Sequence, residues 1–371
     1  MKITFPHMGN TFILTKALLD SLGVDYVIPP RNSKKDLQIG IKYCPEMACL
    51  PLKLNIGNFV QAIEQGADTI LMVGGFGPCR LGYYGEMHQE ILMDNGFKVD
   101  VVILEVSKGQ VGEFINRVKK LSNGSSYFKI IRAVKDAIKI AHYVDELERL
   151  TFKTRPREII KGETDRIYSD FLNSVAGVKG SEQIGALIRD TGQKLLGIQL
   201  KKDFSPIRVG IVGEIYSIIE PFTNFNMEKK LGYMGIEVDR SIMLSYWIKE
   251  HIVKKVLFLN KNTAFKEAAK PYLGAMIGGH AQETIGNSIL YCRKGFDGVI
   301  QIYPLTCMPE IVADSILPTI SREQGIPVLT LIVDEMTGEE GFITRIEAFV
   351  DLLQSRRETE NINETPILSW N

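Results

Sequence analysis

The stretch G-A-D-T-I-L-M-V (Gly66–Val73) carries the strongest signal for the fold, and its pattern returns in G-F-D-G-V-I-Q-I (Gly295–Ile302). Each stretch is a turn signal followed by an apolar run, which is typical of a strand buried in a parallel sheet. Outward from both stretches, strand-like and helix-like segments alternate along the chain. The sequence therefore predicts an α/β fold with a parallel sheet in each half of the chain.

Further elements follow from the spacing of apolar residues and from glycine and proline stop signals. In the first half we expect strands at residues 3–5, 25–28, 69–73 and 99–104, and helices at 11–22, 58–65 and 84–95. In the second half we expect strands at 208–213, 236–238, 298–302 and 328–333, and helices at 227–231, 282–293, 311–324 and 341–353.

The middle of the chain has a different pattern. Residues 112–200 are charged, helix-periodic and poor in strand signals, and Phe128–Leu147 has the pattern of one long amphipathic helix. We expect a helical layer that covers the sheets. The predicted division is an N-terminal α/β domain (1–111), a helical insert (112–204), a C-terminal α/β domain (205–355) and a polar, loosely held tail (356–371).

Composition argues against several classes of protein. The chain carries 44 Lys plus Arg and 44 Asp plus Glu, and this zero net charge argues against a general binder of nucleic acids or membrane surfaces. No apolar run approaches the ~20 residues of a spanning helix. Met1–Phe5 leads straight into a strand-like segment, without a signal peptide. We therefore expect a cytoplasmic protein, whose thiols stay reduced.

Four of the five cysteines lie in short loops beside proline. The loops are Y-C-P-E-M-A-C-L-P-L-K with Cys44 and Cys49, G-G-F-G-P-C-R with Cys79, and Y-P-L-T-C-M-P-E with Cys307. Cysteines of the protein core usually lie within apolar runs of sequence, whereas a cysteine in a turn can project its sulfur into a cleft. The arrangement favours a thiolate-ligated metal centre, and an iron–sulfur cluster fits best.

The positions of these cysteines suggest one shared site. Cys79 and Cys307 each follow a predicted buried strand, and parallel sheets bind ligands beyond the carboxyl ends of their strands. Two sheets that face each other would bring both cysteines to one interdomain cleft. Cys49 precedes a helix whose N-terminus would stabilise its thiolate. Cys44 is either a fourth ligand or merely close to the site, and Cys292, between apolar residues on a helix, is interpreted as core packing.

Other polar residues give weaker signals. The five histidines form no metal-binding pair, although His7 and His280 stand at loop–helix junctions and could face the cleft. Glu86, Glu214 and Glu283 are candidate proton donors. The glycine-rich turns lack the sequence of a P-loop or of a dinucleotide fingerprint, so this chain shows no convincing ATP site of its own. No residue is assigned a catalytic role.

A series of motifs gives the chain a family resemblance. They are C-P-E-M-A-C-L-P-L-K, G-G-F-G-P-C-R-L-G-Y-Y, G-E-I-Y, G-G-H-A-Q-E-T-I-G, D-G-V-I-Q-I-Y-P-L-T-C-M-P-E and I-P-V-L-T-L-I-V-D-E. In this order they resemble the 2-hydroxyglutaryl-CoA dehydratase D-component family, and within it the CoA protein activase branch. The resemblance covers nearly the whole chain, least clearly residues 112–200.

The resemblance implies two Rossmann-like domains with a four-iron, four-sulfur (4Fe-4S) cluster held between them by Cys49, Cys79 and Cys307. Cys44 is an additional cysteine by that comparison and would complete all-cysteine ligation. Five cysteines are too few for a double-cubane cluster, so a single cluster is expected. In the family, an ATP-hydrolysing iron–sulfur activator supplies one low-potential electron, which passes through the cluster to a CoA thioester that then loses water. The family's pairing of subunits also makes a homodimer or a related second subunit plausible.

Two kinds of function remain open from the sequence. The first is an iron–sulfur reductase or electron-transfer protein fed by a separate ATP-hydrolysing activator. As an enzyme it would be a reductase or a dehydratase-type lyase that acts on a CoA thioester or another small molecule. Three cysteine ligands would leave one iron open to substrate, whereas ligation by Cys44 as well would favour electron relay. The second is a zinc-stabilised scaffold held by the same thiolates, or a cofactor-free subunit that binds CoA or a nucleotide.

Overall fold

The computed structural model describes residues 1–73, 80–104, 111–122, 124–253 and 263–364. Its strands are β1 (Ile3–Thr4), β2 (Thr69–Val73), β3 (Asp100–Leu104), β4 (Ile207–Gly213), β5 (Ile236–Arg240), β6 (Gly298–Pro304) and β7 (Val328–Val333). They form a three-stranded sheet in the order β1-β2-β3 and a four-stranded sheet in the order β5-β4-β6-β7. All strand pairs within these sheets are parallel, which confirms the predicted fold class.

The two sheets have the same strand order when the segment around Tyr26 is counted as an edge strand of the first sheet. In the second sheet, β4 lies between β5 and β6. In the first sheet, β1 lies between β2 and the segment around Tyr26, which pairs with Ile3 through a single parallel bridge. The strand predicted at residues 25–28 is thus reduced to this bridge. The segment is followed by Pro29 and Pro30, and proline cannot donate a ladder hydrogen bond.

An aspartate makes the same contact in both halves. Asp68 Oδ1 accepts the backbone N–H of Lys2 at 2.7 Å, and the Asp68 N–H donates to the Lys2 carbonyl at 3.1 Å. Asp297 Oδ2 accepts the backbone N–H of Arg208 at 2.7 Å, and the Asp297 N–H donates to the Arg208 carbonyl at 2.9 Å. The echo between the two decisive stretches therefore corresponds to a repeated structural unit.

Helices pack around both sheets, and between β3 and β4 the chain is entirely helices and connecting loops in its described residues. The first unit contains α1 (Thr11–Leu22), α2 (Lys34–Tyr43), α3 (Leu50–Glu64), the 3-10 turn η1 (Arg80–Tyr83) and α4 (Tyr84–Asp94). The middle contains α5 (Val111–Leu121), α6 (Tyr127–Thr154), α7 (Glu163–Ser174), the 3-10 turn η2 (Val175–Gly177) and α8 (Gly180–Leu196). The second unit contains α9 (Ile215–Ile219), α10 (Met227–Tyr233), α11 (Leu244–Trp247), the π-helical turn η3 (Ile248–Val253), α13 (Ala264–Ala269), α14 (Ala281–Arg293), α15 (Met308–Gln324) and α16 (Glu339–Glu364).

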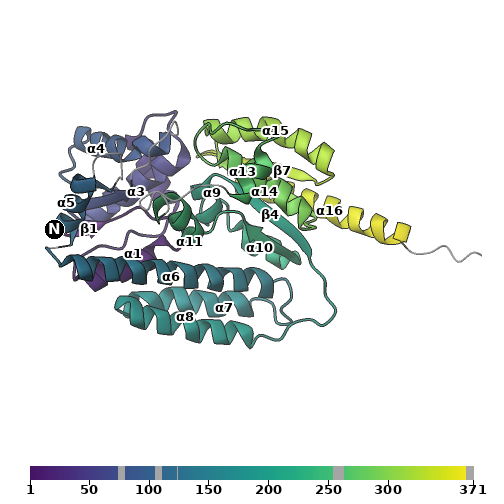
Figure 1. The fold of residues 1–371 in the computed structure, drawn as a ribbon, viewed down its shortest axis with the longest axis horizontal. Helices are drawn as coiled ribbons and strands as arrows, with labels where there is room; N and C mark the ends of the chain where they lie inside the picture. The colour runs from purple at the N-terminus through teal and green to yellow at the C-terminus, as the bar shows by residue number, and fades with distance from the viewer. Residues whose placement is uncertain (74–79, 105–110, 123, 254–262, 365–371) are drawn as a thin grey trace, which may run out of the picture.

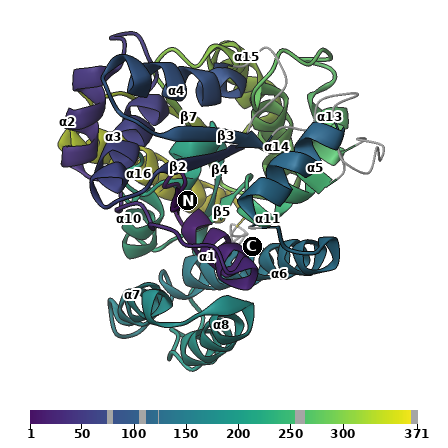
Figure 2. The same cartoon turned by 90° about the vertical axis from the view of Figure 1, so that its left-hand side faces the viewer.

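The long helix α6 lies against both units. It packs on α1 of the first unit and on β5 of the second, with α7 and α8 on its other side (Figures 1 and 2). The guanidinium of Arg240, at the end of β5, pairs with Glu148 of α6 and lies 3.6 Å from Glu228 of α10. The middle of the chain therefore forms the predicted helical layer and is joined to the second sheet by buried charges.

Glycines permit the closest helix contacts in both units. A Cβ on Gly57 of α3 would lie 2.0 Å from the carbonyl oxygen of Asp36 in α2. A Cβ on Gly286 of α14 would lie 2.0 Å from the carbonyl oxygen of Phe265 in α13. Both distances are far below van der Waals contact, so a side chain at either position would push the paired helix away.

Three helices illustrate where the structure differs from the expectation. Helix α2 was not predicted, because its residues include only a few apolar side chains and its stability comes from packing on α3. Helix α3 begins at Leu50 rather than at residue 58. Helix α16 continues to Glu364, into the segment predicted as a loosely held tail, where Arg356 and Arg357 donate to the carbonyl oxygens of Gly325 and Ser205 at 3.0 Å.

None of the helices in the described part of the chain combines the length and apolar character needed to span a membrane.

Candidate metal centre

Helix α3 positions Cys49 where the two units meet. Cys49 is the N-cap residue of this helix, which is buried continuously from Leu50 to Ala62. Leu50 and Leu54 pack in the core of the second sheet, whereas Leu52 packs with Cys49 in a cluster of the first unit. A thiolate at this place lies at the positive end of the helix dipole, which stabilises its charge.

Cys49 has a polar contact inside its apolar surroundings. Its Sγ is hydrogen-bonded to the hydroxyl of Tyr84, the first residue of α4. Both side chains are buried, with exposed fractions of 9% for Cys49 and 5% for Tyr84. Sequence reasoning missed Tyr84, although its place in G-G-F-G-P-C-R-L-G-Y-Y, close after Cys79, was a usable signal.

Cys44 lies close to Cys49 at the other end of the same loop. It is the C-cap residue of α2 and is half-buried against the cluster that contains Cys49. Burial raises the pKa of the Cys44 thiol to about 12, the charge of Lys53 opposes the rise, and Cys49 adds to it. Ligation of a metal by Cys44 stays a prediction.

An ion pair joins the two units beside this loop. The ammonium group of Lys53 in α3 pairs with Glu335, just beyond β7, and donates to the carbonyl oxygen of Glu46 at 2.8 Å. Lys53 is 2% exposed and Glu335 is 23% exposed. The cysteine loop of the first unit is therefore attached to the carboxyl end of the second sheet.

Cys307 lies at that same end of the second sheet. It follows β6, is half-buried and is the N-cap residue of α15. The N–H of Leu305 donates to the carbonyl of Val333 at 2.8 Å, which ties this loop to the end of β7 and so to the segment of Glu335. The loop of Cys49 is thus linked to Glu335 through the Lys53 ion pair, and the loop of Cys307 is linked to the preceding residues at the end of β7.

The third predicted ligand, Cys79, lies outside the described residues. Within the described ranges, no three His, Cys, Asp or Glu side chains form a group that could hold a metal ion. The ligand set of Cys49, Cys79 and Cys307 therefore stays a prediction. The surroundings of Cys49 suit a soft metal centre, because the thiol is buried at a helix N-terminus and meets a hydroxyl group.

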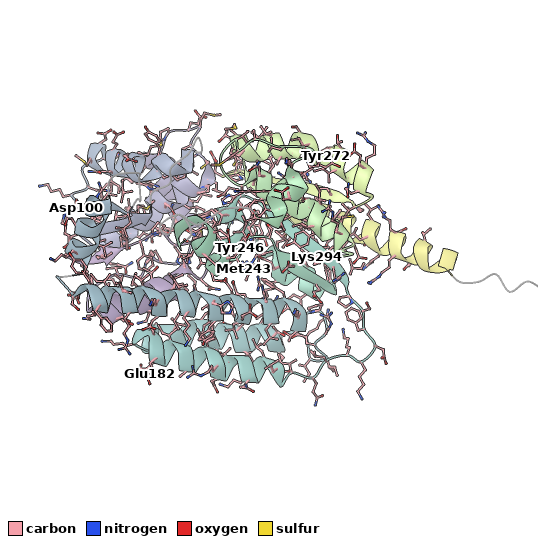
Figure 3. All side chains as sticks on the ribbon, viewed as in Figure 1. Asp100, Glu182, Met243, Tyr246, Tyr272 and Lys294 are labelled. Atoms are coloured by element: carbon pink, nitrogen blue, oxygen red, sulfur yellow. The ribbon has the colours of Figure 1, made fainter. Side chains whose placement is uncertain are left out.

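A group of buried carboxyls lies near Cys307. Glu310, in the first turn of α15, accepts hydrogen bonds from Thr284 Oγ1 at 2.9 Å and Gln301 Nε2 at 3.0 Å. Burial raises the pKa of Glu310 to about 7, and burial with the charge of Glu310 raises that of Glu283 to about 8. Tyr246 of α11, near the middle of the molecule in Figure 3, has its pKa raised to about 12 by burial and then by Glu283. Sequence reasoning identified Glu283 as a candidate proton donor and missed Glu310.

The other two predicted proton donors occupy different environments. Glu214 is the N-cap residue of α9, and its carboxylate accepts the backbone N–H groups of Tyr216 and Ser217, each at 2.9 Å. These bonds cap the first turn of α9, and burial raises the pKa of the Glu214 carboxyl, so its role as a proton donor stays a prediction. Glu86 lies exposed in the first turn of α4.

The two histidines at loop–helix junctions are both buried. His280 is the N-cap residue of α14. His7 Nε2 lies 4.0 Å from Glu220 Oε2, and the His7 carbonyl accepts from the Tyr216 hydroxyl at 2.9 Å. Burial lowers the pKa of His7 to about 4 and raises that of Glu220 to about 7. His7 therefore joins the first unit to the second as a neutral imidazole.

The last cysteine and the glycine turns have structural roles in the described regions. Cys292 lies half-buried against the core, and its Sγ donates to the carbonyl oxygen of Gln324 at 3.2 Å. Gly278 and Gly279 form the turn before α14 with φ angles of 95° and 53°, which favour glycine. The glycine-rich stretch Gly74–Gly77 lies outside the described residues.

Comparison with known proteins gives one family match. Residues 6–74, which contain His7, Cys44, Cys49 and α3, match the family model of the CoA enzyme activase uncharacterised domain. No curated protein matches the chain. The match covers only this N-terminal segment, which is similar to that domain.

Proposed function

We propose that the chain is an iron–sulfur reductase or electron-transfer protein related to the 2-hydroxyacyl-CoA dehydratases. Cys49, Cys79 and Cys307 would hold a 4Fe-4S cluster between the two units. The proposed electron source is an ATP-hydrolysing iron–sulfur activator, and the proposed acceptor is a CoA thioester or another small molecule. When bound, the cluster supplies one-electron transfer at low potential.

The observation that carries this proposal is the placement of Cys49. It begins a helix buried between both units, and Lys53 of the same helix pairs with Glu335 at the carboxyl end of the second sheet. Cys307 begins α15 at that end of the sheet. The family match, which covers the loop of Cys44 and Cys49, independently supports a CoA-related activase or dehydratase context.

The chain's own residues provide a suitable environment for thiolate ligands. Helix N-termini stabilise the charge of a Cys49 or Cys307 thiolate. The apolar cluster around Cys49 excludes water, and the Tyr84 hydroxyl meets its sulfur. Burial and hydrogen bonds to sulfur are two of the levers by which proteins set a cluster's potential.

Iron and sulfide analysis of protein purified without oxygen tests the proposal. We expect a brown protein with near-equal iron and sulfide, whose visible absorption is bleached by dithionite. Cys49→Ser and Cys307→Ser should each lose most of the iron, because each removes a ligand. The matched control is Cys292→Ser, since this half-buried cysteine lies against the core and should not affect iron content.

The same measurement separates the alternatives. A colourless protein with one zinc per chain would overturn the redox function and favour a zinc-stabilised scaffold. Protein without metal after reconstitution would also overturn it and leave a CoA- or nucleotide-binding subunit. In a brown protein, Cys44→Ala should keep the cluster if three cysteines ligate it, and should lose it if Cys44 is the fourth ligand.

A further inference from the structure

The contact between Tyr84 and Cys49 joins two helices at their first residues. Tyr84 begins α4 and Cys49 caps α3, so the hydroxyl and the sulfur meet where both helices start. Both side chains are buried in the same apolar cluster. A hydrogen bond in such surroundings is electrostatically stronger than one in water, because little solvent screens it.

The ring of Tyr84 is held independently of its hydroxyl. It packs against the imidazole of His88 with the ring centroids 5.7 Å apart, and His88 packs against Phe59 at 5.2 Å. His88 is fully buried, and burial lowers its pKa to about 3, so this neighbour is neutral. Removal of the hydroxyl alone should therefore leave the ring in place.

We propose that Tyr84 is a positioning residue that donates its hydroxyl hydrogen to the Cys49 sulfur and thereby raises the reduction potential of the metal centre that Cys49 ligates. The inference rests on the proposed function. A ligating thiolate carries no proton, so the hydroxyl is the donor in this pair. Reduction adds one negative charge to the centre, and a donor at the sulfur stabilises the reduced form more than the oxidised form.

Redox titration of Tyr84→Phe, loaded with iron and sulfide, tests the effect. We expect the equilibrium constant for one-electron reduction to fall roughly tenfold, which corresponds to about 59 mV towards more negative potential. Iron content should stay unchanged. The matched control is Tyr83→Phe, because Tyr83 is the preceding residue and is 70% exposed. Equal potentials in Tyr84→Phe and the wild type would overturn the inference.

A measurement on metal-free protein separates this inference from the proposed function. With 13Cζ-labelled tyrosine, the signal absent from Tyr84→Phe is assigned to Tyr84. Cys49→Ala should shift that signal, whereas Cys292→Ala should not. An unshifted signal would overturn the contact itself. A shifted signal in a protein that takes up no iron would leave the contact standing and overturn both the proposed function and the role in setting a potential.

Discussion

At the scale of single residues, burial decides which ionisable groups carry a charge. His88 is fully buried between the rings of Phe59 and Tyr84. Burial lowers its pKa from 6.5 to about 3, because the imidazolium form loses its hydration. The histidine beside the candidate site is therefore neutral in the folded protein at physiological pH, and its protonation opposes folding.

This residue makes stability sensitive to acid. Between pH 6.5 and about 3, the unfolded chain binds a proton at His88 and the folded chain does not. The free energy of unfolding should then fall with falling pH by about 1.4 kcal/mol per pH unit from this residue. Urea unfolding of His88→Leu from neutral to mildly acidic pH should show a shallower decline, and His142→Leu, at an exposed position, should match the wild type. Parallel declines in His88→Leu and the wild type would contradict the assignment.

At the scale of elements, close helix contacts depend on positions without a side chain. Helices α2 and α3 approach so closely that a Cβ on Gly40 would lie 1.9 Å from the carbonyl oxygen of Lys53. Gly57 makes the reciprocal approach to the backbone of α2. Because α2 and α3 flank the loop of Cys44 and Cys49, their spacing also sets the geometry of that loop.

Alanine substitution tests this packing. Gly57→Ala should destabilise the protein by about 1–3 kcal/mol, because the new methyl group overlaps backbone that cannot rotate away. Gly192→Ala in α8 is the control, since its Cβ would meet only Leu147 Cδ1, at 3.9 Å. That change should be neutral or stabilising by up to about 1 kcal/mol, as expected for glycine in a helix. Urea unfolding measures both, and a neutral Gly57→Ala would show that α2 and α3 are less tightly packed.

At the scale of the whole molecule, a few buried contacts hold the two repeated units together. Leu50 and Leu54 of the first unit pack in the second core, and the Lys53–Glu335 ion pair lies beside them. Lys53 is 2% exposed, so Glu335 and the Glu46 carbonyl, rather than water, stabilise its ammonium group. The ion pair therefore contributes to the relative placement of the cysteine loops.

Removal of one partner should be costly at this junction. Glu335→Gln leaves the buried ammonium of Lys53 without its counter-charge. Because Glu335 is 23% exposed, the loss of stability should be about 2 kcal/mol, less than for a fully buried pair. Glu339→Gln is the control, because the Lys230–Glu339 pair lies within the second unit and Glu339 is 53% exposed. Its effect should be below about 1 kcal/mol. If urea unfolding shows equal effects for the two variants, the buried pair does not stabilise the junction.

Sequence patterns predicted the bounds of one helix and two strands correctly. The predicted bounds of Thr11–Leu22, Thr69–Val73 and Val328–Val333 match the structure. Each combines an apolar pattern with a glycine or proline at its boundary, and such local signals need no tertiary information. Helix α2 carries few apolar residues, so nothing local distinguishes it from a loop until α3 packs on it.

The amino-acid sequence was enough to predict the parallel α/β class, the repeated unit and the loops that hold Cys44, Cys49 and Cys307. Local periodicity and turn residues carry that information, because they act over a few neighbouring positions. Long-range packing was needed to reveal that α3 is buried between the units, that Lys53 pairs with Glu335 and that Tyr84 contacts Cys49. These contacts join residues far apart in the sequence. The first two form when both units pack around α3, and the third forms when α4 packs against α3 within the first unit.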